Sequence, residues 1–213
     1  MLHSFYLLFK ILVVIGLLFC FSCVSVPYVE KHNYNGSLTE LSESIYYISN
    51  DKEMLLKKND YTFTNNGRVK TSETYSSDSI LFVSKEKKLW FVKQSYQDRE
   101  PYYCKTRWKT KNRERISCYT QKRYKENEAF HYYLKDGRID KIEDNFKLFN
   151  TQYFHYNDIG KLISISIKDK NNIVLDSILI TCRSKDKFNN CTELEKNHTI
   201  TDSLIVIKRS IEY

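Results

Sequence analysis

The sequence predicts an all-β fold, an antiparallel meander of repeated hairpins that forms an open or curled sheet. From residue 44 onward, apolar residues alternate with polar ones, as at Ile163, Ile165 and Ile167. A period of two is typical of strands that bury one face. Only two prolines occur in 213 residues, and Tyr, Phe, Ile, Val and Thr dominate the apolar set. These residue types favour pleated structure over helix.

Three segments of similar pattern predict tight hairpins within this sheet. In each, aromatic residues precede a polar turn that contains a glycine, and a cation and an aliphatic strand follow. Glycine suits such turns because it adopts positive φ without a steric penalty. The segments are YTFTNNGRVKTS (61–72), YYLKDGRIDKI (132–142) and YFHYNDIGKLISI (153–165), with glycines Gly67, Gly137 and Gly160.

The repeated hairpins resemble the YD-repeat (RHS-like) hairpins of many Bacteroidetes envelope proteins, over most of residues 60–213. The likeness is clearest near the end, where KDKFNNCTELEK precedes the strand DSLIVIKRSIEY. The turn of that family has Gly and Trp where this chain has Asn189 and Cys191. The resemblance implies hairpins stacked into a continuous meander, and it supplies no catalytic residues.

Residues 1–22 are predicted to be a cleaved export signal. After Lys10 the chain runs ILVVIGLLFCF, eleven apolar residues without a charge. A membrane-spanning helix needs about 20 apolar residues. The run is therefore short for a span and suits the apolar core of a secretory signal. Counting Phe5 to Phe9 lengthens the apolar stretch, so a retained signal anchor is the alternative.

Cys23 is predicted to carry a lipid. The residues Cys20-Phe21-Ser22-Cys23 resemble the lipobox of bacterial lipoproteins, with a small residue directly before the modified cysteine. Ordinary cleavage near Ser22, with Cys23 unmodified, is the alternative. Lipidation would tether the protein to a membrane of the cell envelope. We expect the outer membrane, in either its periplasmic or its surface leaflet.

The remaining four cysteines predict two disulfides, because an even number in an exported domain is typical of disulfide pairing. Cys104 and Cys118 flank one polar turn, and Cys182 and Cys191 flank another. The pairs 104–118 and 182–191 could each join adjacent strands. A zinc site is the competing interpretation, but it requires close pairs such as C-x2-C, which this chain lacks.

The domain organisation follows from these features. Residues 23–43 contain Pro27 and Gly36, are mainly polar and have no clear period, so we expect a flexible tether there. Residues 44–213 form one all-β repeat domain. The net charge of +8 becomes +7 once Lys10 leaves with the signal. The densest basic stretch, Lys105–Arg115, is expected to be a solvated hairpin, and no nucleic-acid partner is predicted.

His131 and His155 occupy similar places in two predicted hairpins, so they are weak candidates for a two-histidine metal site. Histidines among aromatic residues on strands more often serve in packing, and no carboxylate stands at a spacing that completes a site. The sequence contains no nucleophile elbow, phosphate-binding glycine loop or HExxH motif. We expect no catalytic residues, no cofactor and no enzyme activity.

The leading hypothesis is a bacterial envelope lipoprotein that serves as a non-enzymatic scaffold or binding domain. Its partners would be the membrane, through the lipid anchor, and an envelope protein or glycan. A first alternative is a lipid or lipoprotein carrier in which a curled sheet encloses an apolar cavity. A second is an accessory or immunity component of a toxin system. The carrier hypothesis requires an unfilled apolar hollow and fails if the core is filled.

Overall fold

The computed structural model describes residues 26–213, except residues 51, 77–80, 90, 98–101, 111 and 121. The predicted signal at residues 1–22 and the predicted lipid site Cys23 lie outside the described residues. Within the described residues, no helix is long and apolar enough to cross a membrane.

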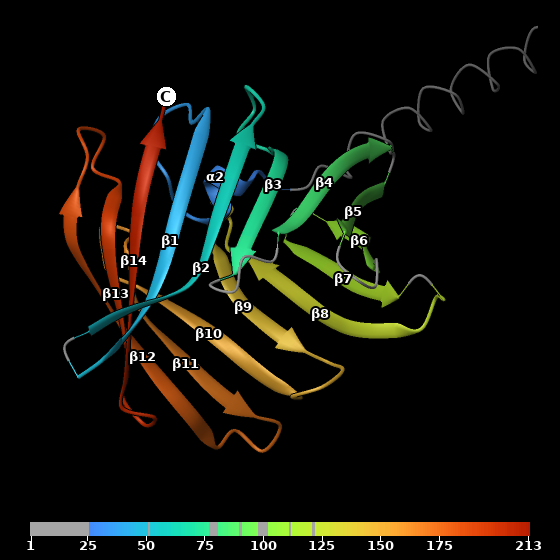
Figure 1. Ribbon diagram of the computed structural model, residues 1–213. Coiled ribbons are helices and arrows are strands. Elements are labelled where there is room, and N and C mark those ends of the chain that lie inside the picture. Colours follow the sequence, from blue (N-terminus) through green and yellow to red (C-terminus); the bar gives the residue numbers. More distant parts are fainter. Residues whose placement is uncertain are drawn as a thin grey trace, which may run out of the picture.

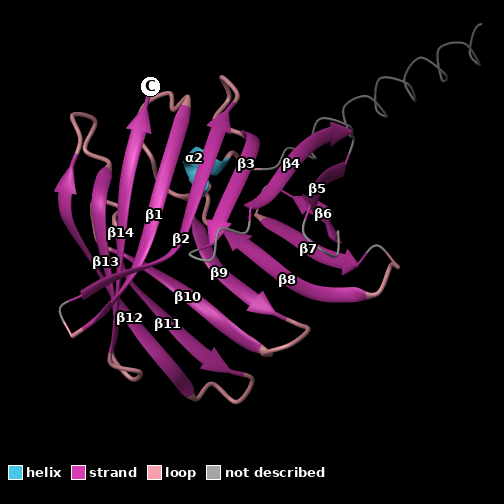
Figure 2. Cartoon of the chain, in the orientation of Figure 1, coloured by secondary structure: helices cyan, strands magenta, loops and turns pink. Residues whose placement is uncertain are grey.

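The described chain is built almost entirely of strands, which confirms the all-β prediction (Figure 2). The elements are α2 (Tyr28–Lys31), β1 (Glu40–Ser49), β2 (Lys52–Phe63), β3 (Val69–Ser76), β4 (Leu81–Leu89), β5 (Phe91–Gln97), β6 (Tyr102–Thr110), β7 (Arg113–Thr120), β8 (Lys125–Tyr133), β9 (Ile139–Asp144), β10 (Asn150–Tyr156), β11 (Leu162–Asp169), β12 (Val174–Lys185), β13 (Cys191–His198) and β14 (Ser203–Glu212).

The strands form one antiparallel meander that curls on itself (Figure 1). Each strand pairs with its neighbours in sequence, and β1 pairs with β14 as well as with β2. The β1–β14 ladder runs from Glu40↔Glu212 to Ile48↔Leu204, so the order of pairing returns to the first strand. The curled form of the predicted sheet is therefore the one observed. Its concave side faces a central interior.

The three predicted glycine turns lie at the same end of the sheet, between β2 and β3, β8 and β9, and β10 and β11. Their glycines have φ values of 66°, 92° and 78° at Gly67, Gly137 and Gly160, a region that L side chains rarely adopt. At Gly137 a Cβ atom would lie 3.0 Å from Val26 Cγ1 and 3.0 Å from Glu30 Oε2. This glycine thus also makes room for the N-terminal residues.

Those N-terminal residues, 26–39, are named the inner segment here because they pack against the concave side of the sheet. Val26 and Leu38 are buried, and β1 already begins at Glu40. Figure 2 shows helix α2 of this segment behind β1, β2 and β3. The prediction of a flexible tether is therefore wrong for residues 26–43, and so is a domain start at residue 44. The segment has no strand or helix period because single apolar residues, spaced irregularly, fix it to the sheet.

Two buried clusters attach the inner segment to the sheet. In the first, Val26 packs with Tyr133 and Ile139. The second surrounds Leu38 and Leu41. There the ring of Tyr28 lies 5.3 Å from that of Tyr61 and 5.4 Å from that of Phe63, measured between centroids. A few large aromatic contacts therefore replace the regular packing of a helix or strand.

Both hairpin disulfides are present in the structure. Cys104–Cys118 joins β6 to β7, with Cα atoms 4.0 Å apart, and Cys182–Cys191 joins β12 to β13, with Cα atoms 5.7 Å apart. All four cysteines are thus engaged with one another, which removes the zinc interpretation. In the described part of the chain, no group of three or more His, Cys, Asp or Glu residues is placed to hold a metal ion.

Candidate ligand-binding hollow

The inner segment leaves part of the interior unfilled. Between it and strands β9 to β14 lies a cavity of about 230 Å³, named the hollow here. One wall of the hollow is apolar and is formed by side chains from five strands. These side chains are Ile139, Phe154, Leu162, Ile165, Ile180 and Leu194.

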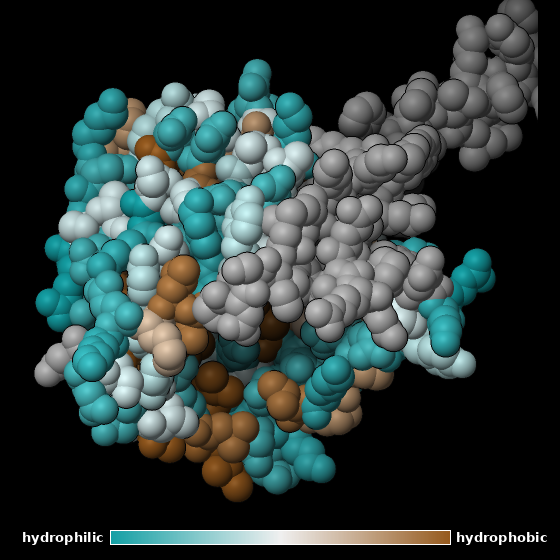
Figure 3. All heavy atoms as spheres, in the orientation of Figure 1, coloured by the Kyte–Doolittle hydropathy of each residue, from teal (hydrophilic) through white to brown (hydrophobic). Residues whose placement is uncertain are grey.

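The alternation of the strands directs these residues inward. Ile165 on β11 is paired with Phe154 on β10 and with Ile178 on β12, so the three side chains share one face. Ile165 and Ile178 are buried, whereas Ile163 is 45% exposed. Other hydrophobic residues of β12 are exposed as well, and brown atoms gather at the lower end of the face drawn in Figure 3. Ile163 is two residues from Ile165 and would share its face in a regular strand, but the β10–β11 register shifts between His155 and Tyr156. Leu162 therefore lines the hollow in place of Ile163. The predicted alternation is confirmed from Ser164 onward and is wrong at Ile163, where the register shift interrupts it.

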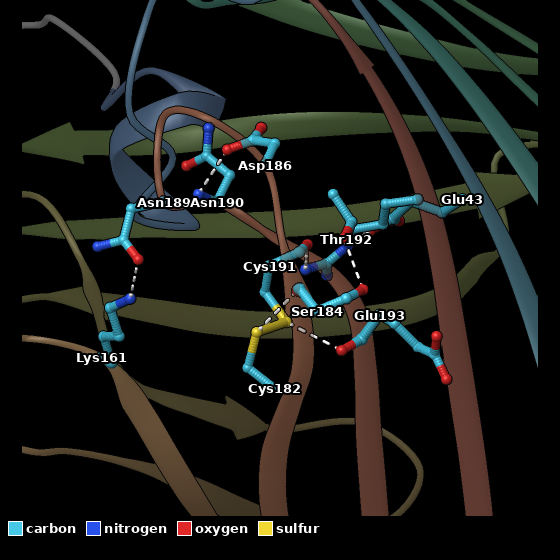
Figure 4. The surroundings of a disulfide bond; sticks show 11 residues. Glu43, Lys161, Cys182, Ser184, Asp186, Asn189, Asn190, Cys191, Thr192 and Glu193 are labelled. Atoms are coloured by element: carbon cyan, nitrogen blue, oxygen red, sulfur yellow. Dashed lines mark hydrogen bonds and ion pairs between the residues drawn. A yellow bond between two sulfur atoms is a disulfide. The ribbon is translucent and has the colours of Figure 1, made fainter.

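The disulfide between Cys182 and Cys191 also lines the hollow. Figure 4 shows it below the turn that joins β12 to β13, with Lys161 to one side. At the mouth, Lys161 Nζ donates a hydrogen bond of 3.0 Å to Asn189 Oδ1. The disulfide therefore holds together the two strands whose turn borders the entrance.

Asn35 and Asn190 attach the inner segment to that same turn. The backbone N–H of Asn35 donates to Asn190 Oδ1 at 2.7 Å, and Asn190 Nδ2 donates to the carbonyl of Asn35 at 2.8 Å. Asn35 Nδ2 donates a further bond of 3.0 Å to the carbonyl of Phe188. Asn190 is only 3% exposed. The side-chain amide of Asn190 thus bonds both backbone groups of Asn35, as a neighbouring strand would, and fixes the inner segment at the edge of the hollow.

Two of the cations on the hollow are neutralised by buried carboxylates. Lys31 of α2 pairs with Glu114 on β7, with Nζ and Oε2 2.8 Å apart. Arg209 on β14 pairs with Glu43 on β1, with Nε and Oε1 2.8 Å apart. Both pairs are largely removed from water, since the side chains of Glu114 and Glu43 are 3% and 10% exposed.

Lys196 on β13 differs from these two cations. It lines the hollow but forms no ion pair or hydrogen bond with any described residue. Its backbone position pairs with Ile180 and Ile205, which places it among the inward residues. Burial lowers the pKa of Lys196, the nearby charge of Arg209 lowers it further, and the charge of Glu43 offsets part of this. A cation without an ion-pair partner of its own therefore stands beside the apolar wall.

Two histidines, His32 of the inner segment and His131 on β8, lie in the same positive surroundings. The His32 ring is exposed to the hollow, and its position inside the curled sheet, followed by the charges of Arg209, Lys31 and Lys196, lowers its pKa to about 3. Burial and the charge of Lys31 lower the pKa of His131 to about 4. Both imidazoles are consequently neutral at physiological pH.

The weak two-histidine metal candidate does not form. His131 on β8 is directed toward the inner segment, whereas His155 on β10 is exposed and has its Nε2 2.7 Å from Ser166 Oγ. His131 precedes its turn glycine by six residues and His155 by five. Because alternate residues point to opposite faces, this offset of one residue places the two rings on opposite faces of the sheet.

Sequence reasoning missed the polar residues of the hollow, although a signal for them was present. Lys196 shares its strand phase with Leu194, and Arg209 shares its phase with Ile207 and Ile211. Charged residues in the apolar phase of a strand indicate buried polar groups. No such signal marked Lys31, because the apolar residues of the inner segment follow neither a strand period nor a helix period.

Comparisons with known proteins identify no family. No known family profile matches the chain, and no curated protein matches it. A putative outer membrane lipoprotein-sorting protein domain from Vibrio parahaemolyticus is similar, at 5% identity and a TM-score of 0.35, over 84% of this chain and 87% of that one. A DUF1329 family protein from Desulfovibrio piger gives 9% identity and 0.35, over 83% and 86%. A LolA superfamily protein from Nitrosomonas europaea gives 9% identity and 0.26, over 87% and 86%.

These findings correct the expected resemblance to YD-repeat proteins. No profile of that family matches, and the similar structures named above are not YD-repeat proteins. The recurring segments at residues 61–72, 132–142 and 153–165 are hairpins of a curled meander, a pattern that glycine turns and strand alternation produce by themselves. Because all three TM-scores are below 0.5, the function has to be argued from the chain's own geometry.

Proposed function

We propose that this protein is a non-enzymatic binding protein of the bacterial envelope that carries a lipid or an acylated ligand. The observation that carries the proposal is the unfilled interior with its apolar wall, six side chains facing a cavity of about 230 Å³. Protein interiors are normally close-packed, and an unfilled apolar space lowers stability. A sheet that served only as a scaffold would have no need of it.

The size of the hollow limits what it holds. Pockets for small molecules usually measure roughly 300 to 1,000 Å³. The hollow is smaller, so it suits one acyl chain or the end of one rather than a whole lipid. A larger ligand would have to displace part of the inner segment, which borders the hollow through Lys31 to Asn35.

We also propose that the protein works while anchored in the envelope through a lipid on Cys23. The signal-like residues 1–22 support export, and two disulfides are typical of an oxidising compartment. Mass spectrometry of the mature N-terminus, combined with membrane fractionation, tests the anchor. A diacylated or triacylated cysteine at position 23 is the expected result. A soluble protein with a different N-terminus would remove the anchor from the proposal.

Two tryptophan substitutions test whether the hollow binds a ligand. Ile180→Trp places a large ring in the hollow, whereas Leu179→Trp adds the same ring to the neighbouring position, which is 50% exposed on the outer face. Calorimetric titration of the full chain with decanoate and decanol is expected to show binding for the wild type and for Leu179→Trp. Ile180→Trp should bind at least tenfold more weakly.

Circular dichroism spectra that match the wild type would show that both variants fold. If the wild type binds neither ligand, the carrier proposal fails and the scaffold hypothesis takes its place. Equal loss of binding in both variants would place the ligand elsewhere than in the hollow.

A further inference from the structure

We infer that the ligand of the hollow carries a negatively charged head group, a carboxylate or a phosphate, which pairs with Lys196. This inference rests on the proposed carrier function, and it narrows the ligand class to amphipathic anions. The observations behind it are the charge balance of the hollow, the position of Lys196 beside the apolar wall, and a second cation at the mouth.

The charge balance leaves Lys196 without a counterion. Of the cations on the hollow, Lys31 is neutralised by Glu114 and Arg209 by Glu43. The other charged groups that act on Lys196 are Arg209, Glu43 and Lys57. Glu43 is already bonded to the Arg209 guanidinium at 2.8 Å. The surroundings of Lys196 are therefore positive.

A cation in this position is costly for the free protein. Removing an ammonium group from water is unfavourable unless a partner compensates it. The lowered pKa of Lys196 and the neutral state of His32 are two consequences of that unfavourable environment. A bound anion would supply the missing counterion and would restore a charge-assisted hydrogen bond. The free energy that destabilises the free protein would then favour binding.

The apolar wall selects the rest of the ligand. Leu194 precedes Lys196 by two residues on β13, and Ile180 is its partner on β12, so the cation is directly beside apolar side chains. A small inorganic anion would leave this wall unfilled. An anion with an alkyl chain meets both surfaces at once. Lys161, at the mouth, adds a second cation on the path of entry.

The test compares ligands that share a chain and differ only in the head group. Decanoate, decyl phosphate and uncharged decanol are titrated into the full chain. Decanoate or decyl phosphate is expected to bind about ten to one hundred times more tightly than decanol, the range of a hydrogen bond to a charged group. The stronger of the two anions identifies the head group as a carboxylate or a phosphate.

Substitution of Lys196 assigns this preference to one side chain. Lys196→Met should remove the preference for the anions and leave decanol binding within about threefold, while Lys196→Arg should retain it. Lys170→Met is the matched control, because Lys170 is an exposed lysine of the β11–β12 turn with no described partner. Its preference should equal that of the wild type. If Lys196→Met fails to fold, Lys196→Gln replaces it.

The outcomes separate this inference from the proposed function. If decanoate, decyl phosphate and decanol bind the wild type equally, the charged head group is refuted while the carrier function stands. A preference that survives in Lys196→Met also refutes the inference, because another cation would then be responsible. If none of the three ligands binds, the carrier function fails, and the inference fails with it.

Discussion

Replacement of Lys31 by methionine tests whether residues 26–39 are docked in the sheet or are a tether. Lys31 Nζ lies 2.8 Å from Glu114 Oε2, and Tyr133 donates its hydroxyl to the same oxygen at 2.8 Å. Methionine keeps the apolar stem of the side chain but removes the ammonium group, which lies 5.0 Å from the centroid of the Tyr133 ring. The substitution mainly removes the charge that compensates Glu114.

The expected loss of unfolding free energy is about 2 to 3 kcal/mol. Breaking a fully buried ion pair costs about 3 to 5 kcal/mol, because one charge is left uncompensated. The side chain of Glu114 is 3% exposed, but that of Lys31 is 19% exposed, and the Tyr133 hydroxyl bond survives. Both facts reduce the cost. A loss of this size is a large share of the stability of an ordinary domain, about 5 to 15 kcal/mol.

Urea unfolding followed by circular dichroism measures the loss, with Lys170→Met as an exposed control expected to stay within about 0.5 kcal/mol of the wild type. Glu114→Gln and the double variant complete a cycle, and the two losses should not be additive because the residues touch. If Lys31→Met changes the unfolding free energy by less than about 0.5 kcal/mol and shows no coupling to Glu114→Gln, residues 26–39 are not docked. The reasoning about the inner segment would then be wrong.

Three further predictions follow from other contacts. Replacing either cysteine pair by serine should lower the unfolding free energy by about 2 to 3 kcal/mol in urea titrations. Only loss of Cys182–Cys191 should also weaken decanoate binding, since only that pair lines the hollow. Equal effects of the two replacements on decanoate binding would contradict this. Gly137→Ala should destabilise more than Gly160→Ala in thermal unfolding, because its Cβ would meet buried Val26, whereas at Gly160 the nearest atom is the terminal guanidinium of Arg138, a long side chain. Burial by itself raises the pKa of Glu128, but hydrogen bonds from Lys125, Arg115 and Ser117 lower it to about 2, below the ordinary value of 4.5. The stability that Glu128 contributes should therefore be complete above about pH 4.5 and be lost as the pH falls toward 2. The unfolding free energies of the wild type and Glu128→Gln should differ at pH 6 and converge near pH 2. A difference that stays constant with pH would refute the lowered pKa of Glu128.

The sequence by itself determined the fold class, the local turns and the disulfide pairs. Strand alternation, glycine turns such as Gly137, and cysteines symmetric about polar turns are all local patterns. Each depends on residues within about fifteen positions of one another, so their physical causes are visible in the chain. Local similarity was misleading for His131 and His155. Their distances to the turn glycine differ by one residue, and that difference places the two side chains on opposite faces of the sheet.

Only the tertiary structure decided where residues 26–39 lie and how the hollow is built. Lys31 reaches Glu114, and Asn35 reaches Asn190, across 83 and 155 residues of sequence. The curl that pairs β1 with β14 makes such contacts possible, and no local pattern encodes the distance between strands that are far apart in the chain. Lys196 could be recognised as a polar residue in an apolar phase, but its missing counterion became apparent only when Glu43 and Glu114 were found bonded elsewhere.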